Sequence, residues 1–443
     1  MSQTFLERAL VPDSTRSKLL VVAGDLPGLP SWTLKDPEFV DSVREARTTI
    51  GIPSPFLRIV RLQGDPVLET EFQTLLEFDA ASADWEPADG LEWLPFDAVA
   101  GGLEAGPFPA DVAAWAAQVA SPHFPPLRAP WARPGWFEAT AAWLGEELAR
   151  RGRSVRGPVE HLGSWAISCL LGADTDQGRV VLKVVPELFR HEPALTLALA
   201  TEHPGQVPAV IATADEERML LMEGFGGAPL GNEDAPRWGD GLVELAGIQQ
   251  AWIGRWPEAE QIGVDNRTLA ALDLELESLF TDAGASPGLA DSDRQRLINH
   301  LPRYRELIGR LAVGPVPETL VHGDFHPWNV QRDGDRLVIY DWSDACWSHP
   351  FFDIPTVTSR TEDLDAREAI RLAYLETWRE YADLPILRQA LDWAAPLAEL
   401  HLAISWRRIR TAFEPDGAFP FVDTGAQRHL EYALASTEAA ESD

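Results

Sequence analysis

Three polar side chains that could carry out chemistry together lie within residues 319–342: Asp324, Asn329 and Asp341. Asp324 follows one apolar run, Asp341 ends the next, and the Asp-Gly-Asp segment at 333–335 predicts a turn between them. We therefore expect a hairpin that brings Asn329 and Asp341 close together, with Asp324 on a short loop beside them. An amide and a carboxylate are hard oxygen ligands that suit Mg²⁺, with phosphate oxygens completing the shell. Because a further carboxylate can orient a hydroxyl for in-line attack, the stretch predicts phosphoryl transfer.

The pattern H-x-D-x-x-x-x-N, followed by an apolar strand that ends in Asp, resembles a known catalytic loop and metal strand. They are those of the aminoglycoside phosphotransferase and choline kinase family, whose members are small-molecule relatives of the protein kinases. The resemblance implies that Asp324 is the catalytic base and that Asn329 and Asp341 hold Mg²⁺. Taken singly, each residue would instead fit an ordinary turn or a strand-end carboxylate, so the prediction depends on the combination.

The same resemblance implies two supporting residues. His322 is expected to support the catalytic loop, and Asp353 is expected to be a structural acid after the metal strand. Protein kinases carry D-F-G at the metal strand. Here Trp342 and Ser343 follow Asp341, as the small-molecule branch permits.

Residues 155–225 predict a β-rich small lobe. One lysine of this lobe is the candidate for binding the nucleotide phosphates. Lys183 lies within the apolar run 179–185, so it would face a core unless it has a polar task, although solvent-facing strand lysines are common. Given the catalytic-loop resemblance, we expect Lys183 to bind the α and β phosphates and to pair with a helix glutamate. Glu192, just before a helix-like run, is the first candidate for that partner, and Glu187 is the second.

Two loops of the same lobe are expected to meet ATP. The run 159–171 is strand-like, with Gly163 and Ser164 at a hairpin tip, and the segment 172–178 is expected to turn into the next strand. Backbone N–H groups at that tip could cover the phosphates, although the segment is no G-x-G-x-x-G. The apolar strand 219–223 leads into Glu223-Gly-Phe225, which is similar to the hinge that meets the adenine through backbone contacts.

From Asp240 onward the sequence predicts mainly helices. Apolar residues recur at helical spacing in the runs 242–253, 268–280, 294–311, 367–381 and 387–412. In the family, the helices after the metal strand help to wall the acceptor pocket. Glu399 and Trp406 are candidates for that wall, although a Glu and a Trp at helical spacing are more often surface and core. The acidic tail, 436–443, is expected to fray.

Residues 1–120 resemble a second family, the Nudix domains. Apolar runs predict strands at 18–23, 57–62, 71–78 and 90–95, with a helix at 37–50. The end of that helix, Arg44 to Ile52, resembles the closing half of a Nudix box. The strand order and the late Gly-Leu-Glu-Trp are also similar to a Nudix domain, so we expect a Nudix-like α/β domain here. An unrelated α+β cap is the alternative.

The residues of a Nudix hydrolase site are not kept. Thr48 and Thr49 stand where the family has two adjacent metal-binding glutamates, Pro30 stands at its glycine position, and Asp36 stands at its glutamate position. Threonine hydroxyls are poor replacements for carboxylates at a divalent cation. We therefore expect a Nudix-like fold that has lost its hydrolase activity.

Prolines separate the two predicted parts. Residues 121–136 contain Pro122, Pro125, Pro126, Pro130 and Pro134. Prolines at this density disfavour helix interiors and central strands, so a stiff, extended linker is expected. The predicted fold is therefore α+β. A Nudix-like domain (1–120) and the linker (121–136) precede a kinase-like bilobal region, with a small lobe and leading helix (137–225) and a helical large lobe (226–443).

Bulk composition excludes several classes of protein. The formal net charge of −32 at pH 7 argues against a nucleic-acid partner. An acidic surface favours a cationic substrate such as an amine, or is only a solubility trait. Cys169 and Cys346 make no disulfide framework, and no apolar run is long enough to span a membrane. The first ten residues lack a signal-peptide core, so a cytoplasmic setting is expected.

The sequence as a whole predicts a kinase that uses ATP and Mg²⁺. The expected acceptor is a hydroxyl of an aminoglycoside, amino sugar, sugar or amino alcohol, and the sequence does not choose among them. Two alternatives remain. One is a phosphotransferase-like binding or regulatory protein, and the other is a Nudix-type nucleoside-diphosphate hydrolase. Lys183, Asp324, Asn329 and Asp341 are all present, which favours the enzyme over the binding protein.

Overall fold

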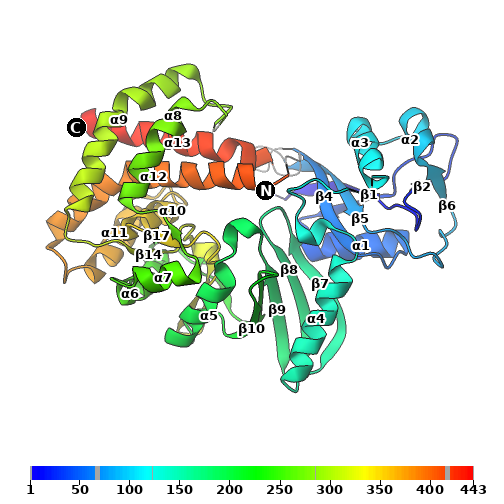
Figure 1. Ribbon diagram of the computed structural model, residues 1–443, viewed down its shortest axis with the longest axis horizontal. Coiled ribbons are helices and arrows are strands. Elements are labelled where there is room, and N and C mark those ends of the chain that lie inside the picture. The colour runs from blue at the N-terminus through cyan, green and yellow to red at the C-terminus, as the bar shows by residue number, and fades with distance from the viewer. Residues whose placement is uncertain (1, 65–69, 122, 285, 415–419, 443) are drawn as a thin grey trace. The chain divides into compact units, whose positions relative to one another are not determined.

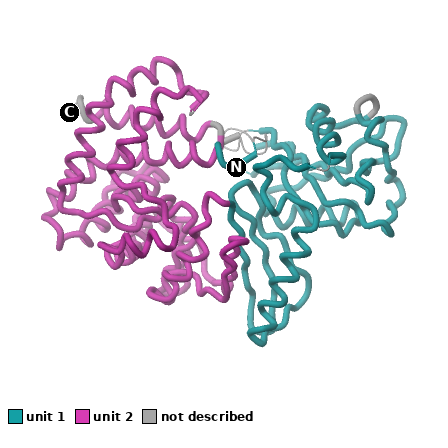
Figure 2. The backbone as a smooth tube through the Cα atoms, viewed as in Figure 1, with its two compact units in different colours: residues 1–186, 411–420 teal, residues 187–410, 421–443 magenta. Residues whose placement is uncertain are grey.

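The computed structural model describes residues 2–64, 70–121, 123–284, 286–414 and 420–442 (Figure 1). Its contacts divide the chain into two compact units (Figure 2). The first unit comprises residues 1–186 and 411–420, and the second comprises residues 187–410 and 421–443. This division groups the strands of the expected small lobe, up to residue 186, with the N-terminal segment. It therefore cuts across the expected domain bounds, which remain a prediction.

A mixed four-stranded sheet of order β3-β1-β5-β4 forms the centre of the N-terminal segment. β1 (Thr4–Leu10) runs antiparallel to β3 (Ser31–Lys35) and parallel to β5 (Glu71–Phe78), and β5 runs antiparallel to β4 (Phe56–Gln63). β2 (Lys18–Val22) and β6 (Leu91–Pro95) form a separate antiparallel ribbon. The strands β2, β4, β5 and β6 confirm the sequence prediction, whereas the sequence did not predict β1 and β3.

Helices cover both faces of this sheet. Successive strand residues point to opposite faces. Accordingly, Ala9 packs in one core with Val43 of α1 (Phe39–Ile50), and Leu10 packs in another with Val112 of α3 (Pro109–Val119). The short helix α2 (Phe96–Gly102) precedes α3. The segment is thus layered as helix, sheet and helix.

The ends of α1 follow ordinary capping rules. Glu38 and Asp41 form a capping box at its start, and Gly51 ends it with φ 72°. Glycine adopts this left-handed conformation without the steric cost that a side chain adds. Val43 and Ala46 are buried one turn apart, so the predicted helix is confirmed with one apolar face.

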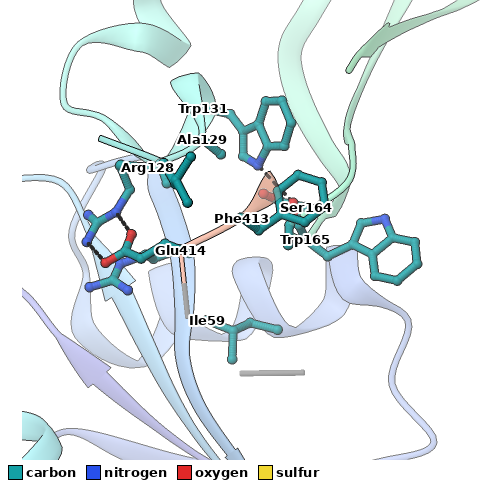
Figure 3. A pocket seen from close by; sticks show the side chains of 12 residues that line it. Ile59, Arg128, Ala129, Trp131, Ser164, Trp165, Phe413 and Glu414 are labelled. Carbon is teal, nitrogen blue, oxygen red and sulfur yellow. Dashed lines mark hydrogen bonds and ion pairs between the residues drawn. The ribbon is translucent and has the colours of Figure 1, made fainter. Parts of the chain in front are cut away.

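The proline-rich segment is packed, not a simple extended linker. It contains a 3₁₀ turn, η1 (Pro130–Ala132), and Trp131 is only 2% exposed. Arg128, also buried, donates to Glu414 through Nε at 2.5 Å and through Nη2 at 3.1 Å (Figure 3). Gln118 accepts a further bond of 2.7 Å from Arg128. The expected extended connector is therefore wrong here, because aromatic and ion-pair contacts fold the segment onto its own unit.

A helix and an antiparallel meander complete the first unit. α4 (Trp136–Arg150) confirms the predicted leading helix, and the ring of its Phe137 stacks on His161 of β7 at 4.7 Å. β7 (Val155–Ser164), β8 (Cys169–Thr175) and β9 (Gly178–Val184) pair in that order. The run 159–171 is thus two strands, and the turn lies only at 176–177. Residues 172–175 continue β8, because their backbone pairs with β9 despite the turn-prone composition.

The second unit begins with a 3₁₀ turn, η2 (Glu187–Phe189), which leads into α5 (Glu192–Glu202). A hairpin of β10 (Val210–Ala214) and β11 (Met219–Glu223) follows. The remaining helices surround one large apolar core. They are α6 (Gly239–Ala251), α7 (Trp256–Ile262), α8 (Leu269–Thr281), α9 (Asp291–Ala312), α10 (Ile354–Thr358), α11 (Leu364–Thr377), α12 (Leu384–Ala412) and α13 (Pro420–Ser442). All five predicted helical runs are confirmed. Within the described ranges, no helix is both long and apolar enough to cross a membrane.

The acidic C-terminal segment is helical. The prediction that it frays is wrong, because α13 continues to Ser442. Thr437 is 3% exposed and its hydroxyl donates to the Tyr304 hydroxyl at 3.3 Å. Glu438 forms an ion pair with Arg296 of α9. A buried threonine on one helix face and a charged pair beside it tie the segment to α9.

Candidate active site

The hairpin expected from the sequence is present. β14 (Thr319–Val321) leads into a loop and the 3₁₀ turn η5 (Pro327–Asn329), after which β15 (Val330–Asp333) pairs antiparallel with β16 (Arg336–Ile339). Val330 lies opposite Ile339, and the Tyr340 N–H donates to the Asn329 carbonyl at 3.0 Å. This register places Asn329 beside the segment that carries Asp341.

Asp324 lies on the loop between β14 and η5, and its side chain is 47% exposed. Its backbone carbonyl accepts a bond of 3.0 Å from the Asn329 side-chain amide. His326 Nε2 is 3.8 Å from the Asp324 carboxylate, and burial lowers the pKa of His326, which favours its neutral form. The carboxylate is therefore accessible to a substrate, while the backbone beneath it is fixed by the amide.

Asn329 and Asp341 carry side-chain oxygens of the kind that Mg²⁺ prefers. Asn329 is 7% exposed, and its Nδ2 is used by the bond to Asp324, with no described donor bonded to its Oδ1. Asp341 is exposed and has φ 66°. A non-glycine residue rarely adopts this conformation, and such residues cluster at functional sites. Both oxygen donors therefore fit Mg²⁺.

The protein alone supplies only part of a metal shell. In the part of the chain that the structure describes, no cluster of three or more His, Cys, Asp and Glu side chains could hold a metal ion. An amide and one carboxylate leave most of an octahedral shell to water and phosphate oxygens. This is the arrangement that the sequence predicts for a metal bound together with a nucleotide.

Buried hydrogen bonds position the loop before Asp324. Asp353 is 1% exposed and accepts from the backbone N–H groups of His322 at 3.0 Å and Gly323 at 2.9 Å. His322 is fully buried and its Nε2 donates to the Tyr340 carbonyl at 3.1 Å. Burial raises the pKa of Asp353 to about 7 and lowers that of His322 to about 4. His322 thus links the catalytic loop to the strand before Asp341.

One residue of this network was missed from the sequence. Gln249 on α6 is fully buried, and its Nε2 donates to Asp353 at 2.9 Å. Its Oε1 accepts from the Tyr374 hydroxyl at 2.5 Å, and the Thr319 hydroxyl donates to its backbone carbonyl at 2.6 Å. A polar residue on the apolar face of a helix was the available signal, because a buried amide needs partners on both ends.

Glu192 and Glu187 have different surroundings. Glu192 is 1% exposed and accepts a bond of 2.8 Å from the hydroxyl of Ser343, a second residue that sequence reasoning missed. Glu187 forms surface ion pairs with Arg190 and Arg218. Lys183 lies in β9 of the first unit and is 6% exposed. Its pairing with Glu192 therefore remains a prediction, and the surface partners of Glu187 make it the poorer candidate.

Gly163 and Ser164 end β7 at the tip of the β7–β8 hairpin. Ser164 lies opposite Cys169, and the turn between these strands includes Trp165. The indole of Trp131 donates to the Trp165 carbonyl at 3.0 Å (Figure 3). The indole of Trp165 donates to the Ser168 hydroxyl at 2.9 Å. A buried tryptophan of the proline-rich segment thus anchors the predicted phosphate-covering tip.

The residues predicted for the hinge and those predicted for the acceptor pocket lie in different surroundings. The Phe225 ring lies 5.2 Å from that of Tyr340, the residue before Asp341, and Glu223 ends β11. Glu399 and Trp406, in contrast, lie against α13. Glu399 accepts from His429 at 2.7 Å, and a Cβ on Gly425 would come within 2.3 Å of the Trp406 ring. These contacts stabilise helix packing and give no support to an acceptor role for either residue.

Comparison with known proteins finds one family that part of this chain resembles. Residues 171–388 match the family model described as the phosphotransferase enzyme family. Asp324, Asn329 and Asp341 lie within the matched segment. The match covers just under half of the chain and shows that this segment is similar to the family. No curated protein matches the chain.

Solved structures of small-molecule kinases are similar to the chain at low sequence identity. Choline kinase LicA from Streptococcus pneumoniae is 15% identical, with 67% of this chain and 99% of that chain covered and a TM-score of 0.48. Choline kinase from Cryptosporidium parvum Iowa II is 12% identical, with 70% and 93% covered and a TM-score of 0.48. Macrolide 2'-phosphotransferase MphH from Brachybacterium faecium is 18% identical, with 67% and 97% covered and a TM-score of 0.43.

Proposed function

We propose that this protein transfers the γ-phosphoryl group of ATP to a hydroxyl of a small molecule. The observation that carries the proposal is the geometry of the hairpin. Asn329 is bonded to the backbone of Asp324 and lies beside the strand that leads to Asp341. The family match of residues 171–388 supports the same reaction class.

In this proposal Asp324 is the catalytic base. Its exposed carboxylate accepts the proton of the acceptor hydroxyl, and the oxygen then attacks the γ-phosphorus as the bond to the leaving diphosphate breaks. Asn329 and Asp341 hold Mg²⁺ through their side-chain oxygens. A bound Mg²⁺ neutralises charge on the phosphates. His322 and Asp353 keep the loop in place through the backbone bonds described above.

ATP would contact several further residues. Lys183 binds the α and β phosphates with Glu192 as its partner, and the tip at Gly163 and Ser164 covers the phosphates. The backbone between Glu223 and Phe225 meets the adenine. The buried position of Lys183 supports its part, because a strand lysine that is 6% exposed needs a polar task.

The acceptor class comes from the family. Aminoglycosides, amino sugars, sugars and amino alcohols are the expected acceptors, in a cytoplasmic enzyme without nucleic-acid or membrane partners. The net charge of −32 favours a cationic acceptor over long range at low ionic strength. The alternative, a phosphotransferase-like binding or regulatory protein, would keep the fold without turnover.

The N-terminal segment is proposed to be a Nudix-like domain without hydrolase activity. The Thr48 hydroxyl bonds to the Arg44 carbonyl at 3.0 Å, and the Thr49 hydroxyl lies 3.2 Å from the Glu45 carboxylate. Both hydroxyls form hydrogen bonds within their own helix, so they do not replace the metal-binding carboxylates of a Nudix hydrolase. Incubation of the full chain with nucleoside diphosphate derivatives and Mg²⁺ or Mn²⁺ should release no monophosphate, and robust release would favour the hydrolase alternative.

The kinase proposal is tested by coupling ATP use to acceptors. Amines, sugars and antibiotics are incubated with ATP and Mg²⁺, and ADP release is followed for the wild type and for Asp324→Asn. We expect the variant to lose at least about 100-fold in turnover while nucleotide affinity changes little, since the base does not hold ATP. Near wild-type turnover in Asp324→Asn would remove this residue from the role of base. Absence of acceptor-dependent ADP release from a broad panel would favour the binding-protein alternative.

A further inference from the structure

A small, partly open cavity lies within the second unit, beside the segment that follows Asp341. Its wall includes residues 343–345, Asp265 of β13 (Asp265–Asn266), and Arg267, which follows β13. The C-terminal part of α12 also lines the cavity. The start of α5 closes another side through His191. The cavity is thus bounded by elements that also position the proposed metal strand.

Arg267 is the unusual residue of this wall. It is 7% exposed, and its guanidinium donates to the Ser405 hydroxyl at 2.6 Å and to the His401 carbonyl at 2.5 Å. Both acceptors are uncharged, and across the described ranges no carboxylate lies within ion-pair distance of Arg267. A buried cation without an anion is costly, and buried arginines are normally paired. Arg267 is therefore a buried cation at the cavity without a direct ion pair among the described residues, and the carboxylates of Asp344 and Glu275 act on its charge only from longer range.

Among the described residues, no other charged residue of the wall forms an ion pair with Arg267. Arg408 forms an ion pair of 2.7 Å with Asp265, so these two charges compensate each other. Asp344 also lines the cavity, as a carboxylate outside ion-pair distance of Arg267. The wall can therefore offer a cation to one end of a ligand and polar groups to the rest.

One residue of the cavity wall, Asp344, contacts the residue before Asp324. Gly323 has φ 83°, and a Cβ added there would lie 2.1 Å from the Asp344 carbonyl oxygen. The backbone of Asp344, which lines the cavity, is thus packed directly on the residue before Asp324. A ligand in the cavity would lie next to the loop that carries the proposed base, which fits part of the acceptor better than a remote effector.

We propose that this cavity is the subsite for an anionic group of the acceptor, and that Arg267 binds that group. The inference rests on the proposed kinase function and narrows its acceptor to a hydroxylated molecule with a carboxylate or a phosphate. Arginine suits both groups, because its planar donors bind two oxygens at once. The overall negative charge does not oppose this, since exposed charges are screened beyond about 8–10 Å at physiological salt.

Matched ligand pairs test the proposal by binding alone. Calorimetry compares ethanolamine with L-serine, and glucose with glucuronate and with glucose 6-phosphate, so that the members of each set differ chiefly in the anionic group. The proteins are the wild type, Arg267→Met, Arg267→Lys and the control Arg294→Met. Among the described residues, Arg294 also bonds only to carbonyl and hydroxyl oxygens, at Phe280, Asp282 and Ser286, and it lies outside the cavity. The glucuronate and glucose 6-phosphate arms distinguish a carboxylate from a phosphate.

We expect the anionic member of at least one set to bind the wild type about tenfold or more tightly than its partner. The preference should vanish in Arg267→Met, fall in Arg267→Lys and persist in Arg294→Met. Equal binding within every set, no binding of any probe, or an unchanged preference in Arg267→Met would overturn the proposal. Arg267→Lys keeps the charge and so covers the case in which Arg267→Met fails to fold. Because no ATP is present, these outcomes are independent of whether the protein proves to be a kinase.

Discussion

The hydroxyl of Ser343 donates a hydrogen bond of 2.8 Å to a carboxylate oxygen of Glu192, and both side chains are buried. Glu192 is the first residue of α5, whereas Ser343 lies two positions after Asp341. The bond therefore ties the orientation of α5 to the metal strand. In the proposed enzyme it also sets the orientation of the carboxylate that is expected to meet the nucleotide lysine.

Ser343→Ala should lower kcat/KM for ATP by about tenfold, because one buried hydrogen bond to a charged group is worth about 1.5 kcal/mol or more. Steady-state kinetics at varied ATP would measure this. Ser348→Ala is the matched control, since it removes a buried hydroxyl bonded at 2.8 Å to the Arg267 carbonyl, away from Glu192. Equal kinetic effects of the two substitutions would show that the Glu192 bond has no special role.

Asp341→Ala and Asn329→Ala should both weaken binding of Mg²⁺-nucleotide, and Asp341→Ala should do so more strongly. The loss should be at least about 100-fold for Asp341 and about tenfold for Asn329, because only the former brings a full charge to the ion. Calorimetry with a non-hydrolysable ATP analogue across a range of Mg²⁺ concentrations would measure both. An unchanged Mg²⁺ dependence in Asp341→Ala would mean that the metal is held elsewhere.

Asp353→Asn should change the pH dependence of stability. Burial raises the pKa of Asp353 from 3.8 to about 7, so the folded state holds this proton more tightly than the unfolded state does. That contribution is fully present below about pH 4 and is lost as the pH rises through about 7. Denaturant unfolding from pH 4 to 8 should therefore show the advantage of the wild type over Asp353→Asn shrinking as the pH rises. A constant or growing difference would contradict the raised pKa.

Trp131→Phe should raise the KM for ATP about three- to tenfold with little change in kcat. The substitution keeps the buried ring but removes the donor that anchors the Trp165 carbonyl, so the predicted phosphate-covering tip becomes looser. Trp85→Phe is a control, because its indole donates to the Gly51 carbonyl at 3.1 Å, away from the hairpin. If Trp131→Phe alters only thermal stability, as the control should, the anchor has no part in nucleotide binding.

The hairpin of Asn329 and Asp341 could be predicted from the sequence because its contacts are local. A turn signal at 333–335 lies between two apolar runs, and the observed register pairs Val330 with Ile339. The neighbouring partners of this site are not local. Gln249 bonds to Asp353 from a helix distant in sequence, and Tyr374 of another helix bonds in turn to Gln249. The only sequence signal for such contacts is a polar residue on an otherwise apolar helix face.

The missed strand β1 has a similar explanation. Glu7 in its middle breaks any simple apolar alternation, yet it is 3% exposed. Its carboxylate accepts from the Trp32 indole at 2.6 Å and from the Ser42 hydroxyl at 2.8 Å. Burial raises the pKa of Glu7. In the sequence alone, a glutamate such as Glu7 is expected at the surface. Its burial can be explained only when the hydrogen-bond donors around its carboxylate are known.

The ion pair of Arg128 with Glu414 has a consequence for synthesis of the chain. A ribosome releases residues in order, so Arg128 emerges long before the acid that neutralises it. The first unit, residues 1–186, stays incomplete until residues 411–420 arrive, after almost all of the second unit has been made. In a nascent chain paused before Glu414, Arg128 would keep, among its side-chain bonds to described residues, the one to Gln118 and lack those to Glu414. Final closure of the first unit therefore waits until residues 411–420 have been made, and premature termination before them would damage the part that was made first.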